Sequence, residues 1–158
     1  MTGIDFFLGG FMRRVCLVSA IMLLVVVTGA QLSSAQAPTY TLTVVVEGVS
    51  QAGGNVGMLV FNSDKGWPDD RKIAFRDIAV EAHPGTNTIE VPNLPAGDYA
   101  VAVIHDVNKN HKLDKNFLGV PTERWGMSTN PSHGLKAPSF DSVKFPLKGN
   151  QEIHIKVQ

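Results

Sequence analysis

Cysteine is almost absent from this chain. The single cysteine, Cys16, lies in an apolar run near the N-terminus, so the remaining sequence can form no internal disulfide. A domain without disulfides has to be held together by its hydrophobic core. The shortage of cysteine also argues against structural zinc, which needs four close nitrogen or sulfur ligands. Neither an HExxH motif nor a paired histidine spacing supplies them.

An excess of charge is also missing. The chain has 14 Lys and Arg residues against 14 Asp and Glu residues. Loss of residues 1–35, which we expect below, would remove Arg13, Arg14 and Asp5 and leave 12 basic and 13 acidic residues, a net charge of −1. Nucleic-acid and anionic-membrane partners require a basic surface. We therefore expect no nucleic-acid partner, no anionic-membrane partner and no membrane insertion of the remaining domain.

The N-terminus carries the pattern of an export signal. Arg13 and Arg14 precede the uncharged apolar segment 15–30, and small and polar residues follow it. This order is typical of a secretory signal peptide, with cleavage after Ala35 or, as an alternative, after Ala37. The segment is shorter than the roughly 20 residues that span a bilayer, which favours cleavage over a retained anchor. We predict a signal peptide at residues 1–35 and a periplasmic or secreted domain at residues 36–158.

Helical periodicity is lacking after residue 40, where apolar residues recur with a period of two. This pattern predicts an all-β domain, a single immunoglobulin-like or transthyretin-like antiparallel β-sandwich, which we expect to be monomeric. We expect the first two strands to form a hairpin across Gly53-Gly54. The last two are joined by Lys148-Gly149-Asn150, where Gly149 can take a positive φ. The seven predicted strands are residues 40–49, 55–62, 72–81, 86–91, 98–105, 142–147 and 151–157.

A stretch with little strand pattern separates His105 from Asp141 and precedes the last two strands. Connections much longer than about 15 residues are usually functional or disordered. A disordered segment would lack apolar anchors, whereas this one contains several, so we predict an ordered excursion. These anchors are Phe117, Leu118, Val120, Trp125, Met127 and Leu135.

The excursion begins with oxygen-bearing side chains at every second position, Asp106, Asn108 and Asn110, followed by Asp114. Calcium loops place ligands at positions 1, 3, 5 and 9 and a backbone carbonyl at position 7, here that of Lys112. Additional ligands are expected from water, Glu123 or Asp141, with His105 adjacent. Position 12 is Phe117 and not the bidentate Glu of an EF-hand, and the flanks are not helical. The competing interpretation is a simple Asx turn, because Asn and Asp hydrogen-bond their own backbone.

Several motifs in a fixed order resemble one protein family. They are Leu94-Pro95-Ala96-Gly97-Asp98-Tyr99 running into His105-Asp106, the loop 108–114, Asn116-Phe117-Leu118-Gly119-Val120-Pro121, Trp125-Gly126-Met127-Ser128 and Pro138-Ser139-Phe140. The sequence resembles the DUF2141 family of exported bacterial proteins over essentially the whole of residues 36–158. This resemblance implies an exported sandwich of transthyretin or carboxypeptidase-regulatory type and no established activity. His111 departs from the family pattern, where glycine is more usual.

Three functional classes remain open. The sequence favours a binding or structural module of the cell envelope, with Ca²⁺ as cofactor and an envelope protein or polysaccharide as partner. The second class is a metal-free accessory of the cell envelope that binds a protein or polysaccharide. Trp67 and Trp125, both predicted in loops, could form a stacking platform, or each could cap the open end of the core. We expect no enzymatic activity, because the sequence around Ser128 lacks the second glycine of a nucleophile elbow. Ser128 or Ser132 with His105 or His133 leaves a convergent hydrolase as the third class.

Overall fold

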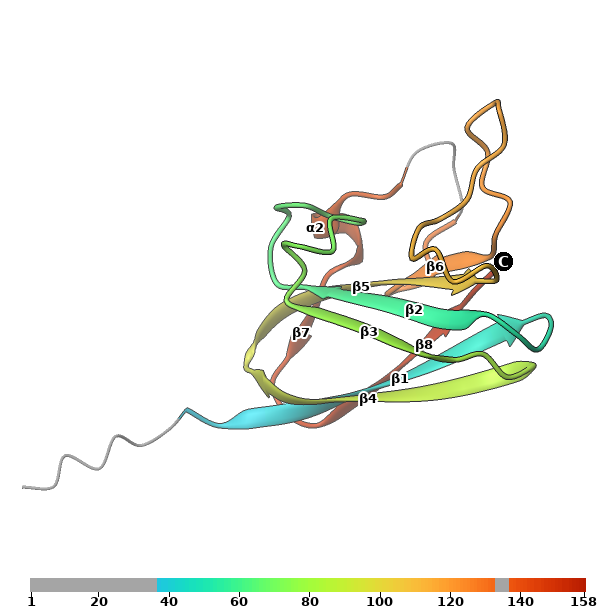
Figure 1. Cartoon of the computed structure of the whole chain (residues 1–158). Coiled ribbons are helices and arrows are strands. Elements are labelled where there is room, and N and C mark those ends of the chain that lie inside the picture. Colours follow the sequence, from blue (N-terminus) through green and yellow to red (C-terminus); the bar gives the residue numbers. More distant parts are fainter. Residues whose placement is uncertain (1–36, 133–136) are drawn as a thin grey trace, which may run out of the picture. The chain divides into compact units, whose positions relative to one another are not determined.

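The computed structural model describes residues 37–132 and 137–158 (Figure 1). The predicted signal peptide therefore lies outside the described residues. Within those residues, no helix is both long enough and apolar enough to span a bilayer. Residues 37–158 form a compact unit with its own hydrophobic core, so this part of the chain can be studied as a domain.

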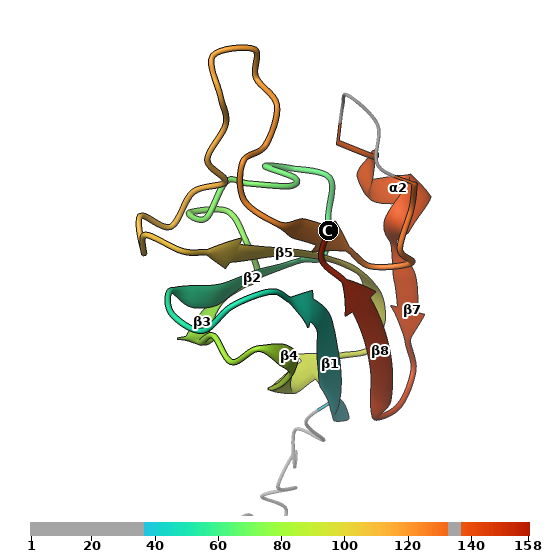
Figure 2. The same ribbon diagram turned by 90° about the vertical axis from the view of Figure 1, so that its right-hand side faces the viewer.

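Two β-sheets make up the domain (Figures 1 and 2). The first contains β1 (Thr39–Val49), β4 (Gly85–Pro95) and β8 (Gln151–Lys156) in the order β4-β1-β8. The second contains β2 (Asn55–Phe61), β3 (Arg76–Glu81), β5 (Gly97–Asp106) and β6 (Trp125–Met127) in the order β3-β2-β5-β6. The strand β7 (Phe145–Leu147) pairs with the start of β5, and α2 (Phe140–Val143) is one helical turn. The predicted all-β sandwich is confirmed, and β6 is an additional strand within the excursion.

The core forms because the period-two pattern places apolar side chains on facing sides of the two sheets. In β1 the alternate residues Leu42, Val44 and Val46 are fully buried. They belong to the same cluster as Val56, Met58 and Val60 of β2 and Val101 and Val103 of β5. Burying each such side chain contributes about 1.5–3 kcal/mol, which has to provide the stability in a domain that contains no cysteine.

The predicted hairpin between the first two strands is wrong. The strand β1 pairs with β4 and β8, whereas β2 pairs with β3 and β5 in the other sheet. The connection through Gly53 and Gly54, both at positive φ, carries the chain from one sheet to the other. The apolar faces of β1 and β2 consequently meet across the core, whereas hairpin strands would place them side by side on one sheet face.

The end of the chain also differs from the prediction. The strands β7 and β8 lie in different pairings, and β8 runs parallel to β1, with Val44 opposite Ile153. Residues 140–143 form α2 instead of the start of a strand. In the connection between β7 and β8, Gly149 does not have a positive φ, and Asn150 Oδ1 instead accepts a hydrogen bond from the Thr41 N–H at 2.9 Å.

A second cluster packs on the outer face of the second sheet, because its residues alternate with the core-facing residues along β2 and β5. It contains Phe61, Ala100, Phe140 and Val143, with Trp67 packed against it. Trp67 meets Phe61 and Phe140 edge to face, at centroid distances of 5.4 and 6.1 Å. The segment before β3 is turned rather than extended: the N–H of Asp70 bonds to Gly66 O and that of Ala74 to Asp70 O. The strand predicted from residue 72 therefore begins at Arg76.

Residues 107–124, which we call the projecting loop, leave the end of β5 and return to it as β6 (Figure 2). The base of the loop is closed by a hydrogen bond from the His105 N–H to Arg124 O at 2.8 Å. Within the described residues, the predicted excursion contains the projecting loop, β6 and part of α2, and its predicted anchor Leu135 lies outside the described residues.

We expect Gly54→Ala to destabilise the domain by about 2–5 kcal/mol, because positive φ costs about 1–2 kcal/mol and overpacking adds about 1–3 kcal/mol. A Cβ on Gly54 would stand 2.6 Å from Val107 Cα, at the base of the projecting loop. Gly53→Ala is the matched control, since Gly53 also has a positive φ but open space around it. Chemical denaturation measures both, and equal losses would show that the close approach at Gly54 carries no cost.

His154 gives the pairing of β1 with β8 a pH dependence. Its ring bonds to Glu47 at 2.8 Å and Glu152 at 3.2 Å, and the hydrogen bond to Glu47 is the larger cause of its raised pKa. This stabilising contribution is present at pH values below the unfolded pKa of about 6.5 and is lost as the pH rises through the folded pKa. NMR titration should show a larger fall in the His154 pKa for Glu47→Gln than for Glu152→Gln. The reverse order would contradict this assignment.

Candidate functional site

The projecting loop is anchored by a buried carboxylate at the end of β5. Asp106 is 1% exposed. Its Oδ1 accepts a hydrogen bond from the Asn110 N–H at 3.0 Å, and its Oδ2 accepts one from the His111 N–H at 2.7 Å. Charge-assisted hydrogen bonds of this kind are about twice as strong as neutral ones. The carboxylate therefore folds the first turn of the loop back toward the strand end.

The next predicted residues continue this turn. Asn108 Oδ1 accepts the Asn110 N–H at 3.0 Å, and Asn110 Oδ1 accepts the Lys112 N–H at 2.8 Å. Both side-chain amides donate to the Asp114 carboxylate, at 2.6 Å from Asn108 and 2.8 Å from Asn110. The loop therefore gathers the side chains of Asp106, Asn108, Asn110 and Asp114, and Lys112 lies within the same turn.

Glu123 lies in the returning half of the loop. Its Oε1 accepts the Val107 N–H at 2.8 Å, and its Oε2 accepts the Asp114 N–H at 3.1 Å. One carboxylate thus connects the outgoing and returning halves of the projecting loop. Of the three additional residues considered from the sequence, Glu123 is the one that the structure brings to the predicted ligand set.

Asp141 and His105 lie elsewhere. Asp141 is on α2, where its carboxylate is 2.9 Å from Lys144 Nζ. His105 is buried, and its Nε2 is 3.1 Å from Gly53 O. Since successive side chains of a strand point to opposite faces, His105 and Asp106 are directed apart. Neither residue belongs to the oxygen cluster of the loop.

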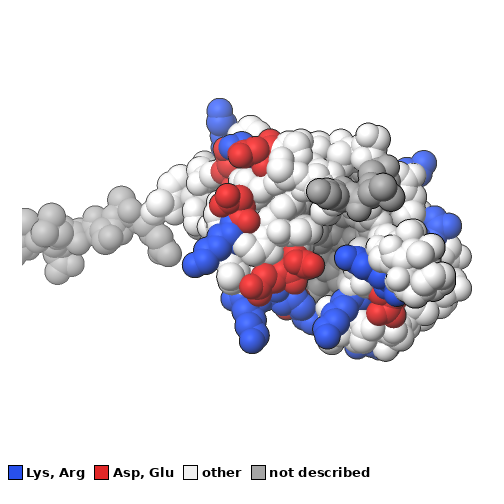
Figure 3. Space-filling view, turned by 90° about the horizontal axis from the view of Figure 1, so that it is seen from above, with Lys and Arg blue, Asp and Glu red and all other residues white. Residues whose placement is uncertain are grey.

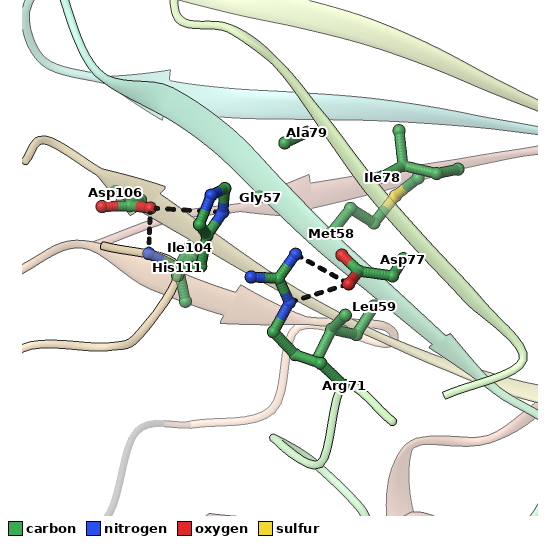
Figure 4. Close-up of a pocket in the computed structure, with 10 residues that line it drawn as sticks. All are labelled: Gly57, Met58, Leu59, Arg71, Asp77, Ile78, Ala79, Ile104, Asp106 and His111. Atoms are coloured by element: carbon green, nitrogen blue, oxygen red, sulfur yellow. Dashed lines mark hydrogen bonds and ion pairs between the residues drawn. The ribbon is translucent and has the colours of Figure 1, made fainter. Parts of the chain in front are cut away.

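His111 occupies the position where the family pattern has glycine. It adopts a φ of 64°, in the left-handed region that glycine takes without cost. Its Nδ1 is 4.0 Å from Asp106 Oδ2, and the two residues line a small pocket of about 30 Å³ beside the Arg71–Asp77 ion pair (Figure 4). The tight turn of the loop is therefore formed with histidine in the glycine position.

The donor set consists of hard oxygen atoms. A carboxylate or amide oxygen that accepts one N–H keeps further lone pairs, which is compatible with a calcium ligand. However, the Asn108 and Asn110 amides direct their NH₂ groups at Asp114, so an ion would have to replace those two hydrogen bonds. Over residues 37–132 and 137–158, no group of three or more His, Cys, Asp or Glu side chains is arranged to hold a metal.

The two tryptophans have different surroundings. Trp67 packs in the second cluster, on the outer face of the second sheet and not at an open end of the core, and donates from Nε1 to Pro138 O at 2.8 Å. Trp125 was predicted in a loop but lies in β6, opposite Ile104 of β5. Its half-buried side chain lines a cleft that does not include Trp67.

This cleft, of about 930 Å³, lies between the outer face of the second sheet and the projecting loop (Figure 3). Its floor includes Leu59 and Ile104, and its other wall includes Leu118 and Val120. Sequence reasoning missed it, although a signal exists. The strands β2 and β5 carry apolar residues on both faces, whereas a solvated sheet face would alternate with polar residues.

Of the two possible nucleophiles of the hydrolase alternative, Ser128 is fully buried and Ser132 is exposed. Ser128 Oγ donates to Val143 O at 2.8 Å and accepts from the Val101 N–H at 3.0 Å, which ties α2 to β5. Both hydrogen-bonding roles of this hydroxyl are therefore structural. His133, one of the possible bases, lies outside the described residues.

Fold and loop together define a two-layer β-sandwich whose fifth strand leads into a polar, self-bonded projecting loop. The chain belongs to the DUF2141 family, described as uncharacterized proteins conserved in bacteria, whose model matches residues 44–155. The resemblance found in the sequence motifs is thereby confirmed. No curated protein and no solved structure matches the chain.

Ser128→Ala should destabilise the domain by about 1–3 kcal/mol, because it leaves the buried Val101 N–H and Val143 carbonyl without their partner. Ser142→Ala is the matched control, since it removes an exposed hydroxyl that bonds only to Ser139 O at 2.7 Å. Urea denaturation compares the two variants. A loss for Ser128→Ala no greater than that of the control would contradict the structural role of this serine.

Proposed function

We propose that this protein is an exported, periplasmic or secreted binding module whose projecting loop is stabilised by Ca²⁺. The partner class is an envelope protein or polysaccharide, bound by the monomeric domain without catalysis. The polar loop organises the excursion, and the excursion provides the contact surface. The leader pattern in residues 1–35 supports export.

One observation carries the ion proposal: five oxygen-bearing side chains predicted as ligands or additional ligands belong to one hydrogen-bonded group. Asp106 accepts the Asn110 N–H, and the Asn108 and Asn110 amides donate to Asp114. Glu123 closes the group from the returning half of the loop. Three formal negative charges and two amides favour a modest affinity, with Kd of about 10⁻⁴ to 10⁻³ M, as in extracellular calcium modules. The larger, flexible coordination of Ca²⁺ suits this set better than the octahedral geometry of Mg²⁺.

The same hydrogen bonds favour a second candidate, a metal-free binding protein of the cell envelope. Every carboxylate of the group already accepts N–H donors, and Asp106 and Glu123 each accept two from the backbone. A loop satisfied in this way is stable as a set of Asx turns. The two candidates differ in whether an ion strengthens an arrangement that the chain can form alone.

Thermal unfolding of residues 36–158 in EDTA and across a Ca²⁺ series distinguishes them, with Mg²⁺ as the ion control. Calcium at ten times Kd should add about 1.4 kcal/mol and raise Tm by roughly 5 °C. Asp114→Asn should abolish this increment, because it removes a formal charge without changing the side-chain shape. Asp141→Asn, which makes the same change on α2, should leave it intact. A Tm that is equal in EDTA and in saturating Ca²⁺ would establish the metal-free candidate.

A further inference from the structure

The far end of the projecting loop exposes three large apolar side chains, which we call the apolar tip: Phe117, Leu118 and Val120. Their exposed fractions are 95%, 71% and 44%. Only two other large hydrophobic residues among the described positions are exposed, Ile73 at 41% and Val107 at 43%. Adjacent exposed hydrophobic side chains usually mark a binding surface.

The apolar tip is held by its own hydrogen bonds. Asn116 Oδ1 accepts the N–H groups of Leu118 and Val120, both at 3.0 Å, and the Asn116 N–H donates to Val120 O at 2.9 Å. Gly119 provides a positive φ of 78°, and Lys115 pairs with Pro121 across the base of the turn. The backbone is therefore ordered while the apolar side chains face solvent, so the exposure is a property of the folded loop.

The charges of the projecting loop are sorted by sign. Lys109, Lys112 and Lys115 are exposed and form no ion pair within the described part of the chain. Asp106, Asp114 and Glu123, in contrast, are buried or half-buried and accept N–H groups of the loop itself. Figure 3 shows Lys and Arg side chains beside the projecting loop. Although the net charge of the domain is near zero, the exposed charges of the projecting loop are therefore positive.

We propose that the apolar tip docks reversibly on the surface of an anionic lipid bilayer, with Phe117 and Leu118 at the boundary of headgroups and acyl chains and the lysines against the headgroups. The loop projects away from both sheets (Figures 1 and 2). A protein partner of ordinary size requires about 800 Å² per side, from about 20–30 residues. A bilayer interface accepts a few protruding apolar side chains without matching their shape, and its anionic headgroups attract lysine.

This inference rests on the proposed role of the excursion as the binding element, but not on calcium. It also replaces the expectation that the domain has no anionic-membrane partner. That expectation was drawn from the net charge of the whole domain, which does not show that the loop carries exposed lysines and buried or half-buried carboxylates. Membrane contact at the tip requires no insertion of the domain, because the sandwich and its core remain unchanged.

Co-sedimentation with vesicles tests the proposal, using residues 36–158 in EDTA and, separately, in Ca²⁺. One vesicle is phosphatidylcholine mixed with phosphatidylglycerol, and the other is phosphatidylcholine alone. The wild type should bind the anionic vesicle more tightly. Phe117→Ser combined with Leu118→Ser should weaken this binding by roughly tenfold or more, with unchanged Tm. Ile73→Ser, which changes a less exposed apolar residue outside the tip, is the control.

Lys112→Gln and Lys115→Gln should each lower affinity for the anionic vesicle by about fivefold and leave binding to the neutral vesicle unchanged. Absence of wild-type binding to both vesicles, or equal binding by the tip variant, would overturn the proposal. Self-association of the wild-type protein in the absence of vesicles, seen as concentration-dependent sedimentation and abolished in the tip variant, would also overturn it. A second copy of the chain would then cover the tip. If the protein binds vesicles in EDTA and its Tm does not depend on Ca²⁺, membrane docking is supported and only the proposed Ca²⁺ site is refuted.

Discussion

The buried carboxylate of Asp106 is the constraint on which the projecting loop depends. It stands at the last position of β5, where the core ends, and it gathers two backbone N–H groups from the first turn of the loop. Removing its charge from water is costly unless hydrogen bonds compensate, so its burial enforces the turn that supplies them. The amides of Asn108 and Asn110 then fix Asp114, and Glu123 joins the two halves of the loop.

Local features of this architecture could be read from the sequence, and long-range features could not. The period of two located the strands β1, β2 and β5, and the alternating oxygens located the loop cluster, because both depend on spacing within a few residues. The same period says which face of a strand is buried but not which strand lies beside it. The hairpin between β1 and β2 was therefore predicted wrongly, and the parallel contact of β1 with β8 was missed. Asp141 was separated from the loop by the turn of α2, which leaves little periodic signal.

The projecting loop combines two surfaces of different character. Leu118 and Val120 belong both to the wall of the cleft and to the exposed end of the loop. Near the sheet, the loop faces Leu59, Ile104 and Trp125, whereas its far end is apolar with lysines beside it. The polar base of the loop satisfies its own hydrogen bonds and holds these side chains away from the core. Because the loop backbone is already ordered, a partner that binds these side chains would not have to compensate for the entropy lost in ordering it.

The central strand of the three-stranded sheet is completed by the last strand of the chain. The strand β1 begins at Thr39, and its partner β8 ends at Lys156, so almost the entire domain separates two neighbours. The ribosome releases β1 before β8, and β1 must then wait with one edge unpaired until β8 has been synthesised. Completion of this sheet is thereby delayed until β8 is available, which leaves an apolar strand edge open to aggregation during that interval.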